Sequence, residues 1–420
     1  MKCGLDLRRA YTDSSENRKD LPVNAPLPLE DNIDAVRRAG EIIGGDLIWT
    51  PETEQRIREA FSVANQWRDS HAHPMRSIHQ TLRSHIRLRE VEGFTAARLK
   101  RMNAIRGKLR RMRGRKRPLG LDTFQDLGGC RAIMGSMKDA ETLIGALKHR
   151  CRHVLWDQND YIHEARPTGY RSHHLKFEFR GTGDKKIYSG RRVEVQIRTD
   201  LQHSWATAVE AIGLFRGEEL KSGKGSSEWL RLFALMSAEF AETEGCDPAK
   251  GMPDRAARMR ELKELNGELG AVKILENLSD AVYWSQDAVQ GRTKPSYYLI
   301  EYDNETRQVH VTPQYKNSFP FRSYEAAEKP DNFSGQETAN VVLIEADKMD
   351  NLTKAYPNYF GDVQLFKMQL NRLLGGEAVK EYEVALQKRS IPTPRERVDP
   401  SWIGRRGMWT EPTPRKKKKK

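Results

Sequence analysis

The sequence predicts an α+β fold, because the spacing of its apolar residues changes twice along the chain. Up to about residue 117, apolar residues recur at intervals of three or four, which is the period of an amphipathic helix. Between residues 120 and 200, several short stretches alternate between apolar and polar side chains, as half-buried strands do. The helical period returns at Asp200. We therefore expect helices on both sides of a central group of strands.

The individual elements can be placed in chain order. We expect helices at residues 31–49, 50–69, 98–117, 139–149, 200–215, 228–244, 253–288 and 363–374. We expect strands at residues 130–134, 153–157, 174–180, 192–199, 297–302, 308–312 and 339–345. Thr50 is the expected N-cap of the second helix, with Pro51 at its first position. Pro118 stops the third helix, and residues 303–306 are predicted to form the turn of a hairpin.

These elements group into five parts. We predict an N-terminal arm at 1–30, a main domain with N-terminal helices at 31–250, and a helical connector at 251–290. A small C-terminal α+β domain at 291–385 and a disordered basic tail at 386–420 complete the chain. The small domain matches no known motif, so its aromatic residues indicate either an ordinary core or a regulatory domain that covers a functional site of the main domain.

Composition excludes several classes of protein. The four cysteines of the 420-residue chain include no Cys-x-x-Cys pair, which excludes a zinc ribbon and a disulfide scaffold and fits a reducing cytosol. The longest apolar runs are about as long as Val341–Ile344, whereas a membrane span needs about 20 apolar residues. The first 20 residues are charged and lack the apolar stretch of a signal peptide. We therefore expect a cytoplasmic protein with no membrane partner.

The positive charge is concentrated in two segments. The net charge is +14, and residues 98–117 carry eleven Lys and Arg residues with no acidic residue. Residues 415–420 carry six more, so the rest of the chain has a net charge of −3. Such clusters bind nucleic acid in many proteins, and they also bind the phosphates of small substrates. Charge alone leaves both interpretations open.

Two expected strands carry polar side chains on one face, because successive side chains of a strand point to opposite faces. The polar residues are Glu194, Gln196 and Arg198 in one strand, and His174, Lys176 and Glu178 in the other. The opposite faces are apolar. An ordinary half-exposed strand has the same pattern, so the alternation by itself does not establish a site.

Asp126 precedes the strand at 130–134 and is followed closely by Gly128 and Gly129, which allow a close backbone approach or a positive φ. Together with a carboxylate on a neighbouring strand, such as Glu194, it could hold Mg²⁺. A magnesium ion flanked by Lys and Arg suits a polyphosphate substrate, for which positioning and charge neutralisation supply most of the catalysis.

Four segments resemble the synthetase domain of the RelA/SpoT family and occur in the order found there. They are the basic segment from Arg98, Phe124-Gln-Asp-Leu-Gly-Gly-Cys-Arg131, the run from Asp160-Tyr161 through Arg166-Pro-Thr-Gly-Tyr170 to His174, and Val193-Glu-Val-Gln-Ile-Arg-Thr199. The resemblance spans roughly residues 75–245. Each motif alone is modest, and the four in register are a strong signal.

The resemblance implies a nucleotidyltransferase-like mixed β-sheet flanked by helices. It also implies transfer of pyrophosphate from ATP to the ribose 3′-hydroxyl of GDP or GTP, which makes the alarmone (p)ppGpp. Asp126 would be a Mg²⁺ ligand, and Glu194 would be the second catalytic acid, aiding the metal or accepting the hydroxyl proton. The ATP-binding residues would be Arg98, Lys100, Lys108 and Arg131, and the acceptor-binding residues would be Tyr170, His174 and Gln196, with the tyrosine stacked on the acceptor base.

The chain also departs from the family pattern. Gly128-Gly129 replaces the usual Ala-Gly, Arg166-Pro167 replaces Lys-Pro, and Glu210-Ala211 and Phe215-Arg216 replace Glu-His and Tyr-Lys. These changes spare the two carboxylates but leave the acceptor open. The chain has no His-Asp dipeptide of the kind found in the hydrolase domain of long family members, so we expect synthesis without hydrolysis.

Two alternatives to a small alarmone synthetase remain. A toxin-type relative would place pyrophosphate on the 3′ end of tRNA, and the basic tail could hold the tRNA backbone. A non-catalytic nucleic-acid-binding protein would use the basic helix but would leave Asp126 and Glu194 unexplained. Unopposed synthesis inhibits growth, so an antitoxin or other inhibitory partner is a further expectation, as is a homo-oligomer.

Overall fold

The fold is that of a computed structural model, which describes residues 33–48, 50–114, 119–216, 218–281, 283–286, 297–303, 308–314, 339–345 and 363–380. All of these residues belong to one compact unit, Met1–Tyr382. The predicted arm at 1–30, the turn at 304–306 and the tail at 386–420 lie outside the described residues.

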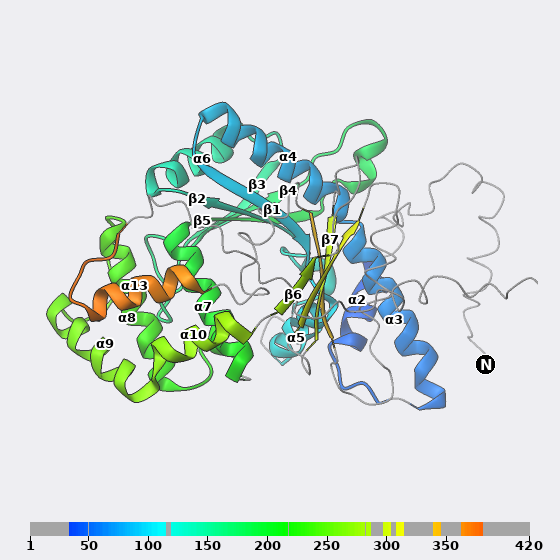
Figure 1. The fold of residues 1–420 in the computed structure, drawn as a ribbon. Helices are drawn as coiled ribbons and strands as arrows, with labels where there is room; N and C mark the ends of the chain where they lie inside the picture. The colour runs from blue at the N-terminus through cyan, green and yellow to red at the C-terminus, as the bar shows by residue number, and fades with distance from the viewer. Residues whose placement is uncertain are drawn as a thin grey trace, which may run out of the picture. The chain divides into compact units, whose positions relative to one another are not determined.

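The chain contains runs of helices and runs of strands, as α+β folds do (Figure 1). The helices are α2 (Ile33–Ile43), α3 (Pro51–Asp69), α4 (Ala72–Arg89), α5 (Met102–Met112), α6 (Met137–Arg150), α7 (Asp200–Arg216), α8 (Ser227–Thr243), α9 (Arg255–Leu269), α10 (Ala271–Ala281) and α13 (Gln364–Leu374). The strands are β1 (Gly93–Leu99), β2 (Gly128–Met134), β3 (Val154–Asp160), β4 (His173–Glu178), β5 (Arg192–Thr199), β6 (Tyr283–Gln286), β7 (Tyr297–Asp303), β8 (Gln308–Gln314) and β9 (Ala339–Glu345). Short 3-10 helices lie at Leu121–Thr123, Gly183–Tyr188 and Leu220–Ser222.

The sheet is mixed, which confirms the predicted fold class. Its strand order is β3-β4-β5-β2-β1-β9-β7-β8-β6. Within the first five strands, β2 and β5 are parallel, and the other neighbours are antiparallel. β9 pairs with β1, so the strands after residue 296 continue the same sheet through Ala97 and Arg98. The boundaries of the predicted domains stay a prediction.

Helices α4 and α6 cover one face of the sheet (Figure 1). Their apolar residues pack against the alternate residues of β4 and β5 that point to that side, including Phe177, Val193, Val195 and Ile197. The opposite face carries the polar residues of the same strands. Because one face of each strand is buried in the core, the polar face is the one available for chemistry.

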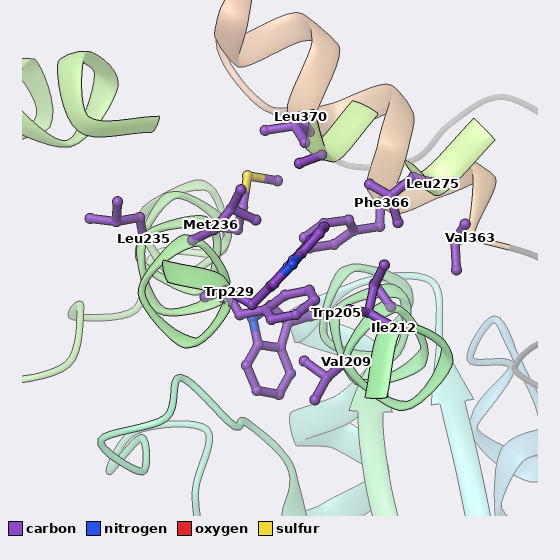
Figure 2. Packing of buried hydrophobic residues seen from close by; sticks show 14 of the residues in the cluster. Trp205, Val209, Ile212, Trp229, Leu235, Met236, Leu275, Val363, Phe366 and Leu370 are labelled. Atoms are coloured by element: carbon purple, nitrogen blue, oxygen red, sulfur yellow. Dashed lines mark hydrogen bonds between the residues drawn. The ribbon is translucent and has the colours of Figure 1, made fainter. Parts of the chain in front are cut away.

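A second core joins helices from distant parts of the sequence. Residues of α7, α8 and α10 pack with Phe366, Leu370 and Leu373 of α13, as Figure 2 shows for the labelled members. The Phe366 ring lies 5.5 Å from that of Phe233 on α8, which in turn lies 6.1 Å from Trp205 on α7. Helix α13 is therefore part of the core that supports α7 and α8.

The predicted start of α3 is confirmed in detail. The Thr50 hydroxyl accepts a hydrogen bond from the Thr53 backbone N–H at 3.3 Å, and the Thr53 hydroxyl accepts one from Thr50 N–H at 2.9 Å. This reciprocal capping satisfies backbone donors that the first turn of a helix leaves unpaired.

Two of the predicted helices were wrong. The segment from Arg98 is not the start of a helix, because Arg98 and Leu99 end β1 opposite Gly129 and Gly128, and α5 begins only at Met102. The region 253–288 is not one helix either. Gly270 takes the left-handed conformation with φ +60° and ends α9, and a strand, β6, follows α10.

Among the residues that the structure describes, no helix combines the length and the apolar character that crossing a membrane requires.

Candidate active site

The pairing of β1 with β2 brings the first group of predicted site residues together. Leu99 lies opposite Gly128, and just beyond this pair the Lys100 N–H donates to the Leu127 carbonyl at 2.8 Å. This contact places the Lys100 side chain beside Asp126. Gly128 allows the tight packing behind it, since a Cβ there would lie 3.2 Å from Cβ of Met75 on α4.

Helix α5 supplies the second lysine. Its buried residues Met102, Ile105 and Leu109 pack in a small core that also contains Phe124 and Leu127, next to Asp126 in the sequence. Lys108, which precedes Leu109 in the helix, reaches Asp126 with its side chain, and its Nζ lies 4.8 Å from the centre of the Phe124 ring.

Asp126 is held between two ammonium groups. Lys100 Nζ donates to Oδ2 at 2.7 Å, and Lys108 Nζ donates to Oδ1 at 3.0 Å. Burial by itself would raise the pKa of Asp126, but the charges of the two lysines outweigh burial and leave the pKa below its usual value. Asp126 is therefore an ionised carboxylate, and the lysines are positioned where a polyphosphate could replace it as their partner.

Glu194 lies on the polar face of β5 with both oxygens engaged. The His174 Nδ1 atom lies 2.9 Å from Oε1, and Gln196 Nε2 donates to Oε2 at 2.7 Å. Burial would raise the pKa of Glu194, but the hydrogen bond and charge of His174 lower it to about 2. Glu194 pairs in register with Gly129 of β2, three residues after Asp126, and its charge acts to raise the pKa of Asp126.

Tyr170 is presented by a turn pressed against α8. Gly169 has φ +90°, and a Cβ there would lie 2.8 Å from Ser237 Cβ, so the turn needs glycine at this position. Ser237 Oγ donates to the Gly169 carbonyl at 2.6 Å. The Tyr170 hydroxyl lies 2.8 Å from His174 Nε2, and its ring lies 6.3 Å from that of Trp205.

The surroundings of Tyr170 favour its ionised form. Burial would raise the pKa of the phenol, but the charges of Arg198 and His174 lower it to about 7. In the same contact, burial lowers the pKa of His174, but Tyr170 and Glu194 reverse this and leave it above its usual value. The three predicted acceptor residues, Tyr170, His174 and Gln196, therefore meet around Glu194.

The two remaining predicted residues, Arg98 and Arg131, lie on adjacent strands near Glu210. Arg98 pairs in register with Gly129 of β2, and Arg131 lies two residues further along that strand. Burial would raise the pKa of Glu210, but Lys221, Arg131 and Arg98 lower it well below its usual value. The charges of both arginines thus act on an acidic residue of α7.

Three residues of this arrangement were missed as site residues. Glu210 accepts a hydrogen bond from Lys221 Nζ across the loop that follows α7. Arg198 donates to the Tyr170 hydroxyl at 2.8 Å. The alternation along β5 places Arg198 on the same polar face as Glu194, which was a usable signal. No pattern pairs Glu210 with Lys221, because the pairing depends on the path of the loop.

The carboxylates suit a magnesium ion in number and chemistry. Magnesium prefers oxygen ligands and commonly uses one or two protein carboxylates together with substrate phosphates. Asp126 and Glu194 supply two carboxylates whose charges interact. No group of three or more His, Cys, Asp or Glu residues within the described ranges is arranged to hold a metal.

Comparison with known sequences and structures gives related proteins over this region. GTP pyrophosphokinase YjbM of Bacillus subtilis (strain 168) is 34% identical over 123 residues, which are 28% of this chain and 55% of the relative. The chain thus matches little more than half the length of that relative.

Two solved structures are also similar to this chain, at lower identity. The small alarmone synthetase 1 of Bacillus subtilis is 23% identical, with 48% of this chain and 94% of that chain covered and a TM-score of 0.34. A GTP pyrophosphokinase family protein from Streptococcus pneumoniae is 20% identical, with 53% and 98% covered and a TM-score of 0.35. Residues 97–217, which include all nine predicted site residues, match the family described as "Region found in RelA / SpoT proteins". The similarity to RelA/SpoT proteins thus covers residues 97–217, which is less than a third of the chain.

Proposed function

We propose that the protein transfers pyrophosphate from ATP to the ribose 3′-hydroxyl of GDP or GTP. The observation that carries the proposal is the position of Asp126, between Lys100 and Lys108 and close to Glu194. Two cations and two carboxylates in one place are what a polyphosphate and its metal require. The name of the Bacillus subtilis relative, a GTP pyrophosphokinase, supports the same activity.

In the proposed reaction, the acceptor 3′-oxygen forms a bond to the β-phosphorus of ATP. The bond between that phosphorus and the oxygen it shares with the α-phosphorus breaks, AMP leaves, and the hydroxyl proton passes to solvent. Mg²⁺, held by Asp126 and Glu194, would neutralise charge on the phosphates. Lys100 and Lys108 would bind the phosphates as they exchange Asp126 for the substrate, and Arg98 and Arg131 would flank the adenine.

Glu194 is better suited to orientation than to proton uptake. A carboxylate with a pKa of about 2 holds a proton weakly at neutral pH. It stays ionised, so it can accept a hydrogen bond from the 3′-hydroxyl and contribute to the metal site. Tyr170 would stack on the acceptor base, with His174 and Gln196 beside it.

Transfer to the 3′ end of tRNA is a second candidate, and the surface of α5 favours it. Lys108 is directed at Asp126, but Arg110, Arg111 and Arg113 at the end of the helix are exposed. These cations exceed what one ATP needs, and they could bind a phosphate backbone. A non-catalytic nucleic-acid-binding protein would use the same arginines but would not need the group around Asp126.

The test offers the acceptors separately. The protein is incubated with Mg²⁺ and ATP labelled in its terminal phosphate, and with GDP, GTP or bulk tRNA in turn. Label in a guanosine nucleotide supports the first proposal, and label in tRNA supports the second. Label in none of them, with tRNA retained on a filter, supports the non-catalytic alternative. The Asp126→Ala protein is the control for contaminating kinases.

A further inference from the structure

Arg198 occupies a position where a charged side chain is costly. It is the last polar residue on the chemical face of β5, and only 2% of its surface is exposed. Among the described residues, no carboxylate forms an ion pair with Arg198, and the Arg198 Nε has no hydrogen-bond partner. Its guanidinium lies 5.2 Å from the centre of the Tyr170 ring. A buried cation without a carboxylate partner destabilises a fold, so its retention calls for another explanation.

The hydrogen bonds of Arg198 close a ring of five side chains. Its Nη2 donates to the Tyr170 hydroxyl at 2.8 Å and to Gln196 Oε1 at 2.9 Å. From Tyr170 the ring continues to His174 at 2.8 Å and from there to Glu194 at 2.9 Å. Gln196 Nε2 closes it by donating to the other oxygen of Glu194 at 2.7 Å.

The ring restricts both groups that the acceptor would meet. The Tyr170 hydroxyl is held from two sides, by His174 and by Arg198, so the position of this end of the side chain is fixed. Both ends of the Gln196 amide are used, which fixes its orientation, and both oxygens of Glu194 are held. Arg198 is the one member that contacts the tyrosine and the glutamine at once. Without it, the tyrosine and the carboxylate would still have His174 between them but would lose the second connection.

We propose that Arg198 is a positioning residue for the acceptor, holding the Tyr170 ring and, through Gln196, the Glu194 carboxylate in one arrangement. Its burial prevents direct contact with substrate, so it acts through those two side chains. The proposal rests on the proposed function, because it assigns these residues to the acceptor. It does not involve Lys100 or Lys108, whose contacts lie with Asp126.

The central experiment compares Arg198→Gln, Arg198→Lys and the matched control Arg192→Gln. Arg192 lies on the same face of the same strand, with its guanidinium carbon 3.9 Å from the centre of the Trp156 ring. It takes no part in the ring of five side chains. For Arg198→Gln we expect the acceptor KM to rise about tenfold and kcat to fall, with the ATP KM changed less than about twofold. Arg198→Lys keeps a donor and should recover part of the loss. Equal changes in both KM values, or the same result for Arg192→Gln, would overturn the proposal.

A double variant tests whether Arg198 acts through Tyr170. Tyr170→Phe removes the hydroxyl to which Arg198 donates. In the Tyr170→Phe background, Arg198→Gln should therefore change the acceptor KM and kcat little further. Fully multiplicative losses would show that the two residues act independently. If Arg198→Gln does not fold, the comparison of Arg198→Lys with Tyr170→Phe gives the same decision.

A spectroscopic measurement separates this proposal from the proposed function. Tyrosinate absorbance that appears in wild type near pH 7 and is absent from Tyr170→Phe reports the Tyr170 hydroxyl. Because the positive charge of Arg198 favours the ionised phenol, Arg198→Gln should shift this signal to higher pH. An unchanged signal would refute the contact with Arg198, whether or not the protein transfers pyrophosphate. A shifted signal in a protein without transferase activity would leave the contact standing and reject the function.

Discussion

The ammonium group of Lys108 lies 3.0 Å from Oδ1 of Asp126, although 18 residues separate them in the chain. The lysine projects from α5, and the aspartate lies in the segment that leads into β2. One small apolar core holds both in place. The two lysines that we propose to bind phosphate are therefore already assembled around the aspartate, whose negative charge offsets the repulsion between them.

Replacing Lys108 should weaken ATP binding selectively. We expect Lys108→Ala to raise the ATP KM by about tenfold, because a charge-assisted contact to phosphate is lost while the acceptor residues are untouched. Steady-state kinetics with ATP and GDP varied in turn would measure this. Arg110→Ala is the control, since Arg110 lies on the same helix but pairs with Asp46. An equal effect of both variants would indicate a general electrostatic contribution.

Removing either predicted metal ligand should abolish transfer without unfolding the protein. We expect Asp126→Ala and Glu194→Ala each to lower kcat by at least about 100-fold, because magnesium placement or orientation of the 3′-hydroxyl is lost. Labelled-phosphate transfer measures the loss, and circular dichroism checks the fold. Full activity in Glu194→Ala would reject the proposed chemistry.

Stability should fall as pH is lowered from 7 to 5. Burial, with a nearby arginine, lowers the pKa of His71 to about 3 and that of His153 to about 4. Between pH 6.5 and 5 both stay neutral in the folded protein but take up protons when it unfolds, so acid favours the unfolded chain. We expect about 1–2 kcal/mol of lost unfolding free energy for each histidine.

Urea unfolding at the two pH values measures this loss. The variant His71→Gln/His153→Gln should show a smaller difference between pH 7 and 5 than wild type, whatever its stability at pH 7. A difference as large as that of wild type would assign the acid sensitivity to other groups.

Phe366 should be essential to the core although it lies far along the chain. We expect Phe366→Ala to lower the unfolding free energy by about 3–5 kcal/mol, because its ring is buried between Phe233 and Phe240. Met368→Ala on the same helix is the control, since that side chain is 42% exposed. Similar stability of the two variants would mean that α13 does not pack on α8 in solution.

A structural feature could be predicted from the sequence where it depends on a pattern of neighbouring residues in the chain. The polar face of β5 follows directly from strand alternation, and so does the position of Glu194 on it. Strand β1 was missed because its central residues are buried on both faces, so Gly93–Leu99 shows no alternation. Its alanines also favour a helix in isolation. Pairing with β2 and β9 overrides that preference.

The contacts within the site depend on long-range geometry. Arg198 could be placed on the correct face, but its partner Tyr170 comes from a turn 28 residues earlier. The resemblance to RelA/SpoT proteins named the residues that gather around Asp126 and Glu194. It did not reveal the closed ring of side chains, because the ring exists only once three segments of chain are folded together.

A row of rings runs from Phe366 through Phe233 and Trp205 to Tyr170. This row of rings determines which C-terminal deletion can test a regulatory role. Deleting residues 290–420 would remove Phe366 along with any regulatory segment, so a loss of activity would report a damaged core. A cut after Tyr382 spares the whole row. Any change of activity in that shorter protein can then be attributed to the residues removed.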